Sequence, residues 1–338
     1  MRKGLLKFVL SLISLCALFS FVPALAAEGD VNGVIISPPL TEKQAAPGSV
    51  YSDSVKVTNP NANADLTVTV SVEDFVAKGE DGQQSFIESA ENNSSYSLGR
   101  WLTVSENSFE LKSNQSKVVN YTINVPANAE PGGHYGVIFF SPTLSASNQA
   151  NSNSVLAIPK IGALILFTVP GDINYSGQIT SFEAGKKVDD TFTAKKLFID
   201  SNNVIDYLTK FQNSSSTHVK PVGEIVIKNM FGKEIAKLTV NDKDGNVLPD
   251  SVRKFENQSE IKHGFGLYNT SVTLSYGENK TVSAIYSFWI VPWKETVGAV
   301  VVLIILIWIF RNLSWKKKNS QIADNNTTNN TSNTSSNI

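Results

Sequence analysis

The chain has 338 residues, of which 41% are hydrophobic and 17% are charged, and this length allows two or three domains. Its net charge of −1 is unevenly distributed, because the two ends hold 8 of the 29 basic residues and only 2 of the 30 acidic ones. The body therefore has 21 basic and 28 acidic residues, a net charge of −7, which argues against a surface that neutralises the phosphates of nucleic acids.

Residues 1–27 have the pattern of a secretory signal peptide. Three basic residues precede an apolar run from Leu10 to Val22, and Ala24-Leu25-Ala26 is a small-x-small cleavage site. We therefore expect export, with a retained membrane anchor as the alternative. Cys16 is the only cysteine of the chain and lies in this segment, so the mature protein is predicted to lack disulfides and thiolate metal sites.

The body shows the period of two that is typical of strands with one buried face. Apolar residues alternate with polar ones in 66–73, 119–125 and 282–290, and turn clusters such as Glu130-Pro131-Gly132-Gly133 separate such segments. No long stretch of the body has apolar residues at helical spacing. The pattern predicts a mainly β fold, with two immunoglobulin-like antiparallel β-sandwich domains in tandem.

We place the first sandwich at 28–170 and the second at 171–291. Each half contains a Gly-x-Tyr step into a strand, at Gly133-His134-Tyr135 and Gly266-Leu267-Tyr268, and such a tyrosine could hydrogen-bond back to the preceding connection of its own domain. Two polar segments, 79–98 and 144–154, do not fit a minimal sandwich. Long loops are either functional or mobile, so we interpret these two as contact surfaces or as mobile loops.

A transmembrane helix is predicted at 294–315. Val297–Phe310 contains 14 residues without a polar side chain, and Trp293 and Trp315 lie 22 positions apart, which is about 33 Å along a helix and matches a hydrocarbon layer of about 30 Å. A buried core helix is the alternative. Lys316-Lys317-Lys318 follow, so the positive-inside rule places the tail 316–338 in the cytoplasm and the body outside the cell. This basic and Asn/Ser/Thr-rich tail is expected to form no regular structure.

No constellation of residues in the body indicates catalysis. The three histidines, His134, His218 and His263, have no second His or Cys nearby for a metal pair, and no Gly-x-Ser-x-Gly motif is present. Glu73 and Asp74 are the most suggestive acids, but neighbours on a strand point to opposite faces. We predict a protein that is not an enzyme and needs no cofactor.

The segment Asp242–Asn246 resembles a calcium loop but lacks the ligand spacing of one. We interpret it as an Asp-Gly hairpin turn between strands at 235–240 and 247–248.

Three residues are our candidates for contact with a ligand: Trp101, His134 and Tyr135. An exposed Trp could stack on a sugar, whereas a Trp that opens an apolar strand, as in Trp101-Leu102-Thr103-Val104, is usually part of a core. His134 and Tyr135 follow two glycines at the start of a strand.

The first domain contains a series of short motifs: Ile36-Ser37-Pro38-Pro39, Ala46-Pro47-Gly48, Val55-Lys56-Val57-Thr58-Asn59-Pro60, Leu66-Thr67-Val68-Thr69-Val70 and Pro131-Gly132-Gly133-His134-Tyr135-Gly136-Val137. Mainly in these motifs, the sequence resembles the WxL-interacting proteins of Gram-positive bacteria. The resemblance implies a peptidoglycan-binding immunoglobulin-like domain, then a second β-sandwich that leads into the membrane at Phe288-Trp289-x-x-Pro292-Trp293. It also implies contact with cell-wall glycan and with a surface protein.

Three functions remain open at this point. The first is a membrane-anchored binding protein of the cell surface that contacts a cell-wall polymer or a surface protein. The second is an assembly factor similar to the pilus chaperones, which acts by pairing strands with a client; it requires an exposed apolar edge strand, for which Val155–Val169 is the candidate. The third is a surface hydrolase, which would need acids of raised pKa in one cleft.

Overall fold

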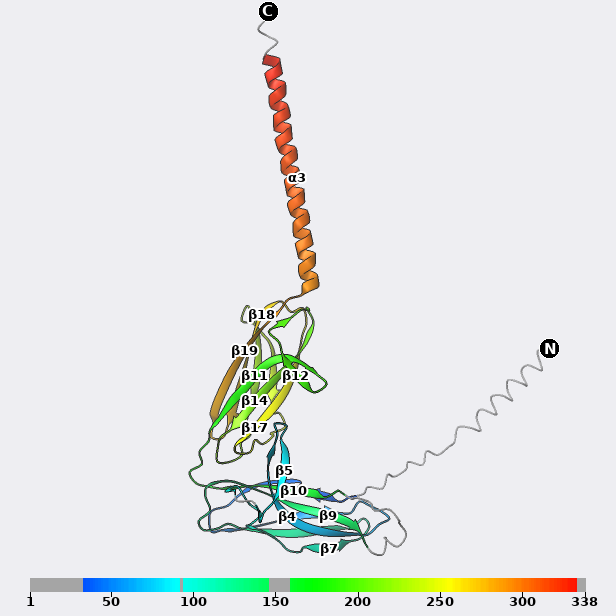
Figure 1. Ribbon diagram of the computed structural model, residues 1–338, viewed down its shortest axis with the longest axis vertical. Coiled ribbons are helices and arrows are strands. Elements are labelled where there is room, and N and C mark those ends of the chain that lie inside the picture. The colour runs from blue at the N-terminus through cyan, green and yellow to red at the C-terminus, as the bar shows by residue number, and fades with distance from the viewer. Residues whose placement is uncertain (1–32, 92–93, 146–158, 333–338) are drawn as a thin grey trace, which may run out of the picture.

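The computed structural model describes residues 33–91, 94–145 and 159–332. The predicted signal peptide 1–27 and most of the predicted loop 144–154 lie outside the described residues. The predicted fold class is confirmed, because the body consists of strands in two β-sandwiches and a single long helix follows them (Figure 1).

The first sandwich consists of two sheets with the core between them. One sheet has the strand order β1 (Ile35–Ser37), β3 (Val50–Thr58), β8 (Ser116–Asn124) and β6 (Leu102–Val104). The other has the order β2 (Leu40–Gln44), β10 (Ile161–Val169), β9 (Gly132–Leu144), β4 (Leu66–Lys78) and β5 (Gln83–Glu88), and β7 (Ser108–Leu111) also pairs with β4. The alternating segments at 66–73 and 119–125 lie in β4 and β8 and turn Leu66, Val68, Val119 and Tyr121 into the core, as their period predicts.

The second sandwich repeats this plan. One sheet has the order β12 (Thr191–Ala194), β11 (Gly177–Val188), β14 (Asn203–Asn213) and β17 (Ser251–Ile261). The other has the order β13 (Leu197–Phe198), β19 (Lys280–Ile290), β18 (Gly266–Tyr276), β15 (Val222–Asn229) and β16 (Glu234–Val240). Its core is rich in aromatic residues, among them Tyr207, Phe211, Tyr268 and Phe288.

The strand proposed as an exposed edge is not an edge. β10 pairs antiparallel with β9 on one side and parallel with β2 on the other, so its backbone has no open side along Leu164–Thr168. The prediction of Val155–Val169 as the strand that pairs with a client is therefore wrong. The reason is that β2, which covers β10, comes from residues about 120 positions earlier in the chain, a pairing that local sequence does not encode.

The helix α3 runs from Trp293 to Ser332. Its first part, Trp293–Asn312, is long and apolar enough to cross a membrane, judged by length and composition, and none of it is buried against the body. The helix continues through most of the segment for which we expected no regular structure, so that expectation is wrong. Extending a helix adds one hydrogen bond for each residue ordered, whereas starting one is costly, so the apolar segment can nucleate a helix that runs on into the polar tail.

Candidate functional site in the cleft between the sandwiches

One sheet of the first sandwich is covered on both faces. Its inner face joins the core, and its outer face forms a second apolar cluster of Phe75, Tyr135, Val137, Phe139 and Leu166, against which Leu248 of the second sandwich packs. β9 is accordingly buried at every position from Gly132 to Phe140. This outer face, which we call the docking face, is where the second sandwich meets the first.

The hairpin of β4 and β5 extends from the docking face to the second sandwich (Figure 1). At its tip the carboxylate of Glu80 lies 2.7 Å from Lys210 Nζ, and the carboxylate of Asp81 lies 2.8 Å from Lys254 Nζ. The N–H of Lys254 donates to the carbonyl oxygen of Glu80 at 2.8 Å. The predicted polar segment 79–98 is thus partly a hairpin, and its tip contacts the second sandwich.

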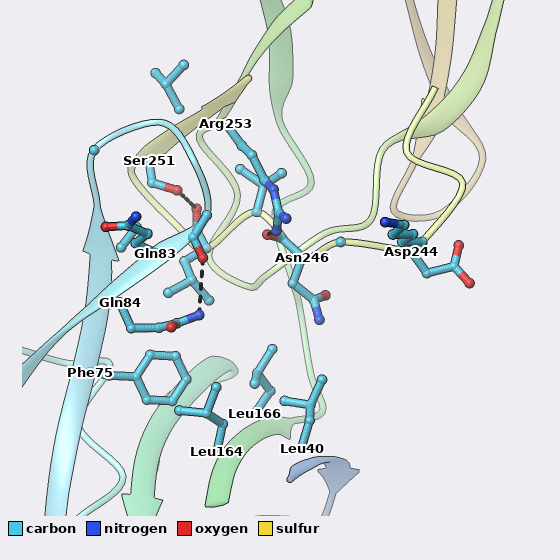
Figure 2. Close-up of a pocket in the computed structure, with 18 residues that line it drawn as sticks. Leu40, Phe75, Gln83, Gln84, Leu164, Leu166, Asp244, Asn246, Ser251 and Arg253 are labelled. Carbon is cyan, nitrogen blue, oxygen red and sulfur yellow. Dashed lines mark hydrogen bonds between the residues drawn. The ribbon is translucent and has the colours of Figure 1, made fainter. Parts of the chain in front are cut away.

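A cavity of about 240 Å³ lies between the hairpin, the docking face and the second sandwich. Figure 2 shows its apolar side, formed by Leu40, Phe75, Leu164 and Leu166 of the first sandwich, and opposite to it the polar side chains Asn246, Ser251 and Arg253 of the second. The volume is below the range of about 300–1,000 Å³ that is typical of sites for drug-sized ligands. It suits a group about the size of one amino-acid residue.

Arg253 is the principal charge in this cavity. Its guanidinium lies between two glycines: a Cβ added at Gly82 would be 2.5 Å from Cζ, and one at Gly245 would be 2.8 Å from it. Gly82 also has a φ of +74°, which side chains disfavour. One guanidinium nitrogen, Nη1, donates to the carbonyl oxygen of Asn246 at 2.7 Å. The two glycines make room for a half-buried cation at the boundary of the two domains.

Arg253 has no carboxylate partner among the residues that the structure describes. The neighbouring acids of the hairpin tip pair with Lys210 and Lys254 instead. Burial lowers the pKa of the guanidinium, but arginine remains charged in proteins. A half-buried positive charge without a counter-ion favours the binding of an anion, and the planar donor fork of arginine matches a carboxylate.

A second, polar groove of about 550 Å³ continues from the cavity along β17, and both are lined by Lys243 and Arg253. β17 is the last strand of its sheet. Since the N–H of Lys254 points away from β14, the alternation of an antiparallel pair also directs the N–H groups of Glu256 and Gln258 to the open side. Within the described ranges, neither has a backbone partner there.

The residues that the sequence singled out as contacts lie away from the cavity or beneath its surface. Trp101 packs partly buried against the first core, and its ring lies 4.2 Å from that of His134. His134 and Tyr135 are only 3% and 2% exposed. These two have almost no exposed surface in this structure. Contact of a ligand with Trp101, His134 or Tyr135 stays a prediction.

Tyr135 binds across the domain boundary. Its hydroxyl accepts a hydrogen bond from the backbone N–H of His218 at 2.8 Å and lies 3.3 Å from His218 Nδ1. The predicted bond to the preceding connection of its own domain is therefore replaced by one to the second sandwich. Burial raises the pKa of Tyr135, so the phenol stays protonated.

His218 is held neutral in the same interface. Burial, together with the positive charge of Lys220, lowers its pKa to about 4 against the opposing effect of Glu42. Glu42 of β2 joins the domains beside it, because one carboxylate oxygen lies 2.7 Å from Lys220 Nζ and the other accepts from Asn246 Nδ2 at 2.6 Å. These contacts close the side of the interface opposite to the hairpin.

The other polar residues considered from sequence have structural roles. Asp74 is fully buried and accepts from the hydroxyl of Ser97 and from the N–H groups of Leu98 and Gly99, while Glu73 pairs with Lys160 at 2.8 Å. No group of three or more His, Cys, Asp or Glu that could hold a metal ion occurs in the part of the chain that the structure describes.

The turn 241–246 forms a wall of the cavity, but it is not the predicted hairpin turn. Val247 forms a bridge with Val219 and not with β16. Asn241 closes the turn by hydrogen bonds to the backbone of Gly245 in both directions.

Sequence reasoning missed Arg253, Asn246 and the apolar side of the cavity. The available signal was the polar segment 79–98, interpreted as a contact surface or a mobile loop, which contains Gly82. Nothing near Arg253 in the sequence shows that its neighbours are Gly82 and the docking face, because those contacts join residues about 170 positions apart.

No known family profile matches the sequence, and no curated protein sequence is similar to it. Among solved structures, the class 5 fimbrial chaperone CfaA is similar with 12% identity and a TM-score of 0.39, over 75% of this chain and 98% of that one. The chaperone DraB of E. coli has 12% identity and a TM-score of 0.33, over 76% of this chain and 96% of its own. The Pseudomonas aeruginosa chaperone CupB2 has 9% identity and a TM-score of 0.33, over 74% and 98%. These values are too low for the likeness to say what this chain binds.

Proposed function

We propose that this protein is a membrane-anchored binding protein of the cell surface, without catalytic activity, that holds the extended C-terminal segment of an exported partner protein. The observation that carries the proposal is the half-buried guanidinium of Arg253, which has no carboxylate partner in the described residues and faces a small cavity with an apolar side. The terminal carboxylate of the partner would pair with Arg253, and its last side chain would occupy the apolar part.

The edge of β17 from Glu256 onwards, beyond the contact of Lys254 with Glu80, supports the extended form of the ligand. Backbone groups on such an edge can pair with an added strand, and the polar groove leads along this edge to the cavity. β17 starts at the cavity with Ser251 and ends at Ile261, so a segment that ends at Arg253 runs antiparallel to it. This is the assembly-factor hypothesis with the pairing strand moved from β10 to β17.

The anchored location rests on α3 and its flanks. An apolar helix of this length can span a bilayer, and the basic residues after it favour a cytoplasmic C-terminus. The body, with the cleft, would then face the outside of the cell, where exported proteins pass.

The resemblance to the WxL-interacting proteins adds a proposed second ligand, the cell-wall glycan, alongside a surface protein. If it extends to function, the full chain in detergent is retained on purified peptidoglycan. The Arg253→Gln variant is then retained equally, since glycan contact would not use the cleft. A chain that passes through unretained would leave the protein partner as the proposed ligand.

Peptide binding by the full chain tests the proposed cleft. The probe is a synthetic peptide of alternating Thr and Val that ends in Leu, prepared as the free acid and as the C-terminal amide. We expect the free acid to bind about tenfold more tightly than the amide, because a charge-assisted pair with a half-buried arginine contributes about 1.4 kcal/mol or more. Isothermal titration calorimetry gives both affinities.

Matched variants separate the cleft from general charge. Arg253→Gln should remove the preference for the acid, and Arg253→Lys should keep only part of it, because lysine lacks the planar fork. Lys237→Gln is the control because it removes the same charge away from the cleft. Lys237 of β16 forms an exposed ion pair with Glu224 of the neighbouring strand β15. Equal affinities for acid and amide in the unmodified chain would refute the proposal.

A further inference from the structure

The end of the second sandwich opposite to the cleft exposes large apolar side chains on three separate loops. Ile199 after β13 is 60% exposed, Phe231 between β15 and β16 is 83% exposed, and Phe265 before β18 is 62% exposed. Exposed side chains of this size in one region of a soluble domain usually indicate an interaction surface. We call these three side chains the apolar tips.

Strand pairing places the three loops together. Asn229 lies opposite Tyr268 at one side of β18, and Gly266 and Phe198 both lie opposite Ile290 of β19. The N–H of Gly264 donates to the carbonyl oxygen of Ser201 at 2.7 Å, which joins the loop of Phe265 to the loop of Ile199. The tips therefore surround the end of β19.

The helix α3 leaves from this same end (Figure 1). Only Val291 and Pro292 separate β19 from α3, and two extended residues reach about 7 Å at most. The hydroxyl of Ser201 donates to the carboxylate of Glu295 at 3.0 Å, so the first turn of the helix also touches the loop of Ile199. If α3 crosses a bilayer, the apolar tips must therefore lie close to the surface of that bilayer.

We propose that the apolar tips insert into the interfacial layer of the outer leaflet and seat the second sandwich on the membrane. The inference rests on the membrane anchoring in the proposed function and adds a second contact with lipid. Apolar faces of surface-bound segments, with side chains such as Phe and Leu, enter the boundary between headgroups and acyl chains by about 5–10 Å, and Trp is enriched at the membrane interface. Trp293, which is half exposed at the start of α3, marks the same level.

A lipid surface fits these tips better than a protein partner does. The tips stand on three separate loops around the start of the helix, and the short link between β19 and α3 leaves little room for a folded domain between sandwich and bilayer. Seating this end fixes the orientation of the molecule. The cleft then lies at the far end of the second sandwich, and the first sandwich extends away from the membrane.

Spin labels on the full chain test the seating. The chain, with Cys16→Ser, is reconstituted in vesicles of equimolar phosphatidylcholine and phosphatidylglycerol, and single cysteines carry nitroxides at Phe231→Cys and Phe265→Cys. Ile285→Cys is the matched control, because Ile285 is 75% exposed on the flank of β19, five residues before the strand ends. Ile304→Cys reports on α3. Collision with oxygen relative to a water-soluble nickel chelate measures the lipid exposure of each label.

We expect a higher oxygen-to-nickel ratio at 231 and 265 than at 285. A further variant carries a label at Ile199→Cys together with Phe231→Ser and Phe265→Ser. Its oxygen-to-nickel ratio should be lower than that of the same label in a chain that keeps both phenylalanines. Ratios at 231 and 265 as low as at 285, with the label at 304 in lipid, would overturn the seating alone. Labels at 231 and 265 shielded from both reagents would overturn it in favour of a protein contact. A label at 304 outside the lipid would refute the anchoring and the seating together.

Discussion

The two sandwiches use their sheets differently. In the first, β9 has the core on one face and, on the other, the second domain together with Phe86 and Tyr96 of its own domain. Nine consecutive residues, Gly132–Phe140, are buried. In the second, β18 buries every other residue and leaves the residues between them exposed or partly exposed. Both strands pair antiparallel with both of their neighbours, in sheets of similar size, so the difference lies in what covers the outer face.

The difference between the two strands shows how a contact between domains can be recognised in a sequence. An antiparallel strand with one free face alternates, whereas a strand covered on both faces becomes a continuous apolar run. The runs Tyr135–Phe140 and Ala163–Phe167 supply the apolar residues of the docking face except Phe75, which comes from β4. A continuous run inside an otherwise alternating domain thus marks the face on which another domain docks.

The largest expected effect comes from removing a side chain of the docking face. Tyr135→Ala should lower the free energy of unfolding by about 3–5 kcal/mol, the usual cost of truncating a buried aromatic residue. It also leaves the buried N–H of His218 without its acceptor. We expect the single thermal transition of the two docked domains to divide into two, which differential scanning calorimetry would show.

A substitution on the exposed face of a strand in the second sandwich is the control for Tyr135→Ala. Thr281→Ala changes an exposed residue on the outer face of β19 and should change the free energy of unfolding by less than about 0.5 kcal/mol. Tyr135→Ala could instead change the free energy of unfolding as little as Thr281→Ala, or leave a single thermal transition at the original temperature. Either result would mean that the docking face does not stabilise the molecule.

Much of the fold could be predicted from sequence because its cause is local. Alternation identified the strands that contribute to both cores, and the apolar stretch with its tryptophans identified α3. The pairing of β2 with β10 could not be predicted, since it is parallel and joins Leu40 to Leu164. Which strand is an edge depends on such distant partners.

The candidate site could not be predicted from the sequence either, because it also depends on contacts between distant residues. Arg253 is one charged residue among several in β17, and its role follows from Gly82 and Gly245, which make room for the guanidinium. His134 and Tyr135 follow two glycines at the start of a strand, and this local pattern does not show whether their side chains are buried. The hydroxyl of Tyr135 lies over Gly133, where an added Cβ would be 2.0 Å from it. These glycines allow close packing, not exposure.

A smaller effect is expected from pH, and the part of it that comes from His218 acts on the contact between the domains. His218 has a pKa of about 4 in the folded protein against about 6.5 when unfolded, so the unfolded state binds the proton more tightly. Its contribution to stability is complete above about pH 6.5 and is lost as the pH falls towards 4. From about pH 7 to about pH 5 the loss amounts to roughly 2 kcal/mol.

Urea unfolding at both pH values, for the natural chain and for His218→Gln, measures this loss. The variant should lose less stability than the natural chain on acidification, by roughly 2 kcal/mol. Burial also lowers the pKa of His134, which adds a loss of the same sign, but His134 lies in the first sandwich, where its ring packs beside that of Trp101. His134→Gln is therefore the control: it should reduce the acid sensitivity of the first sandwich and leave that of the domain contact unchanged. Equal acid sensitivity in the natural chain and in His218→Gln would mean that the contact between the sandwiches does not depend on a neutral His218.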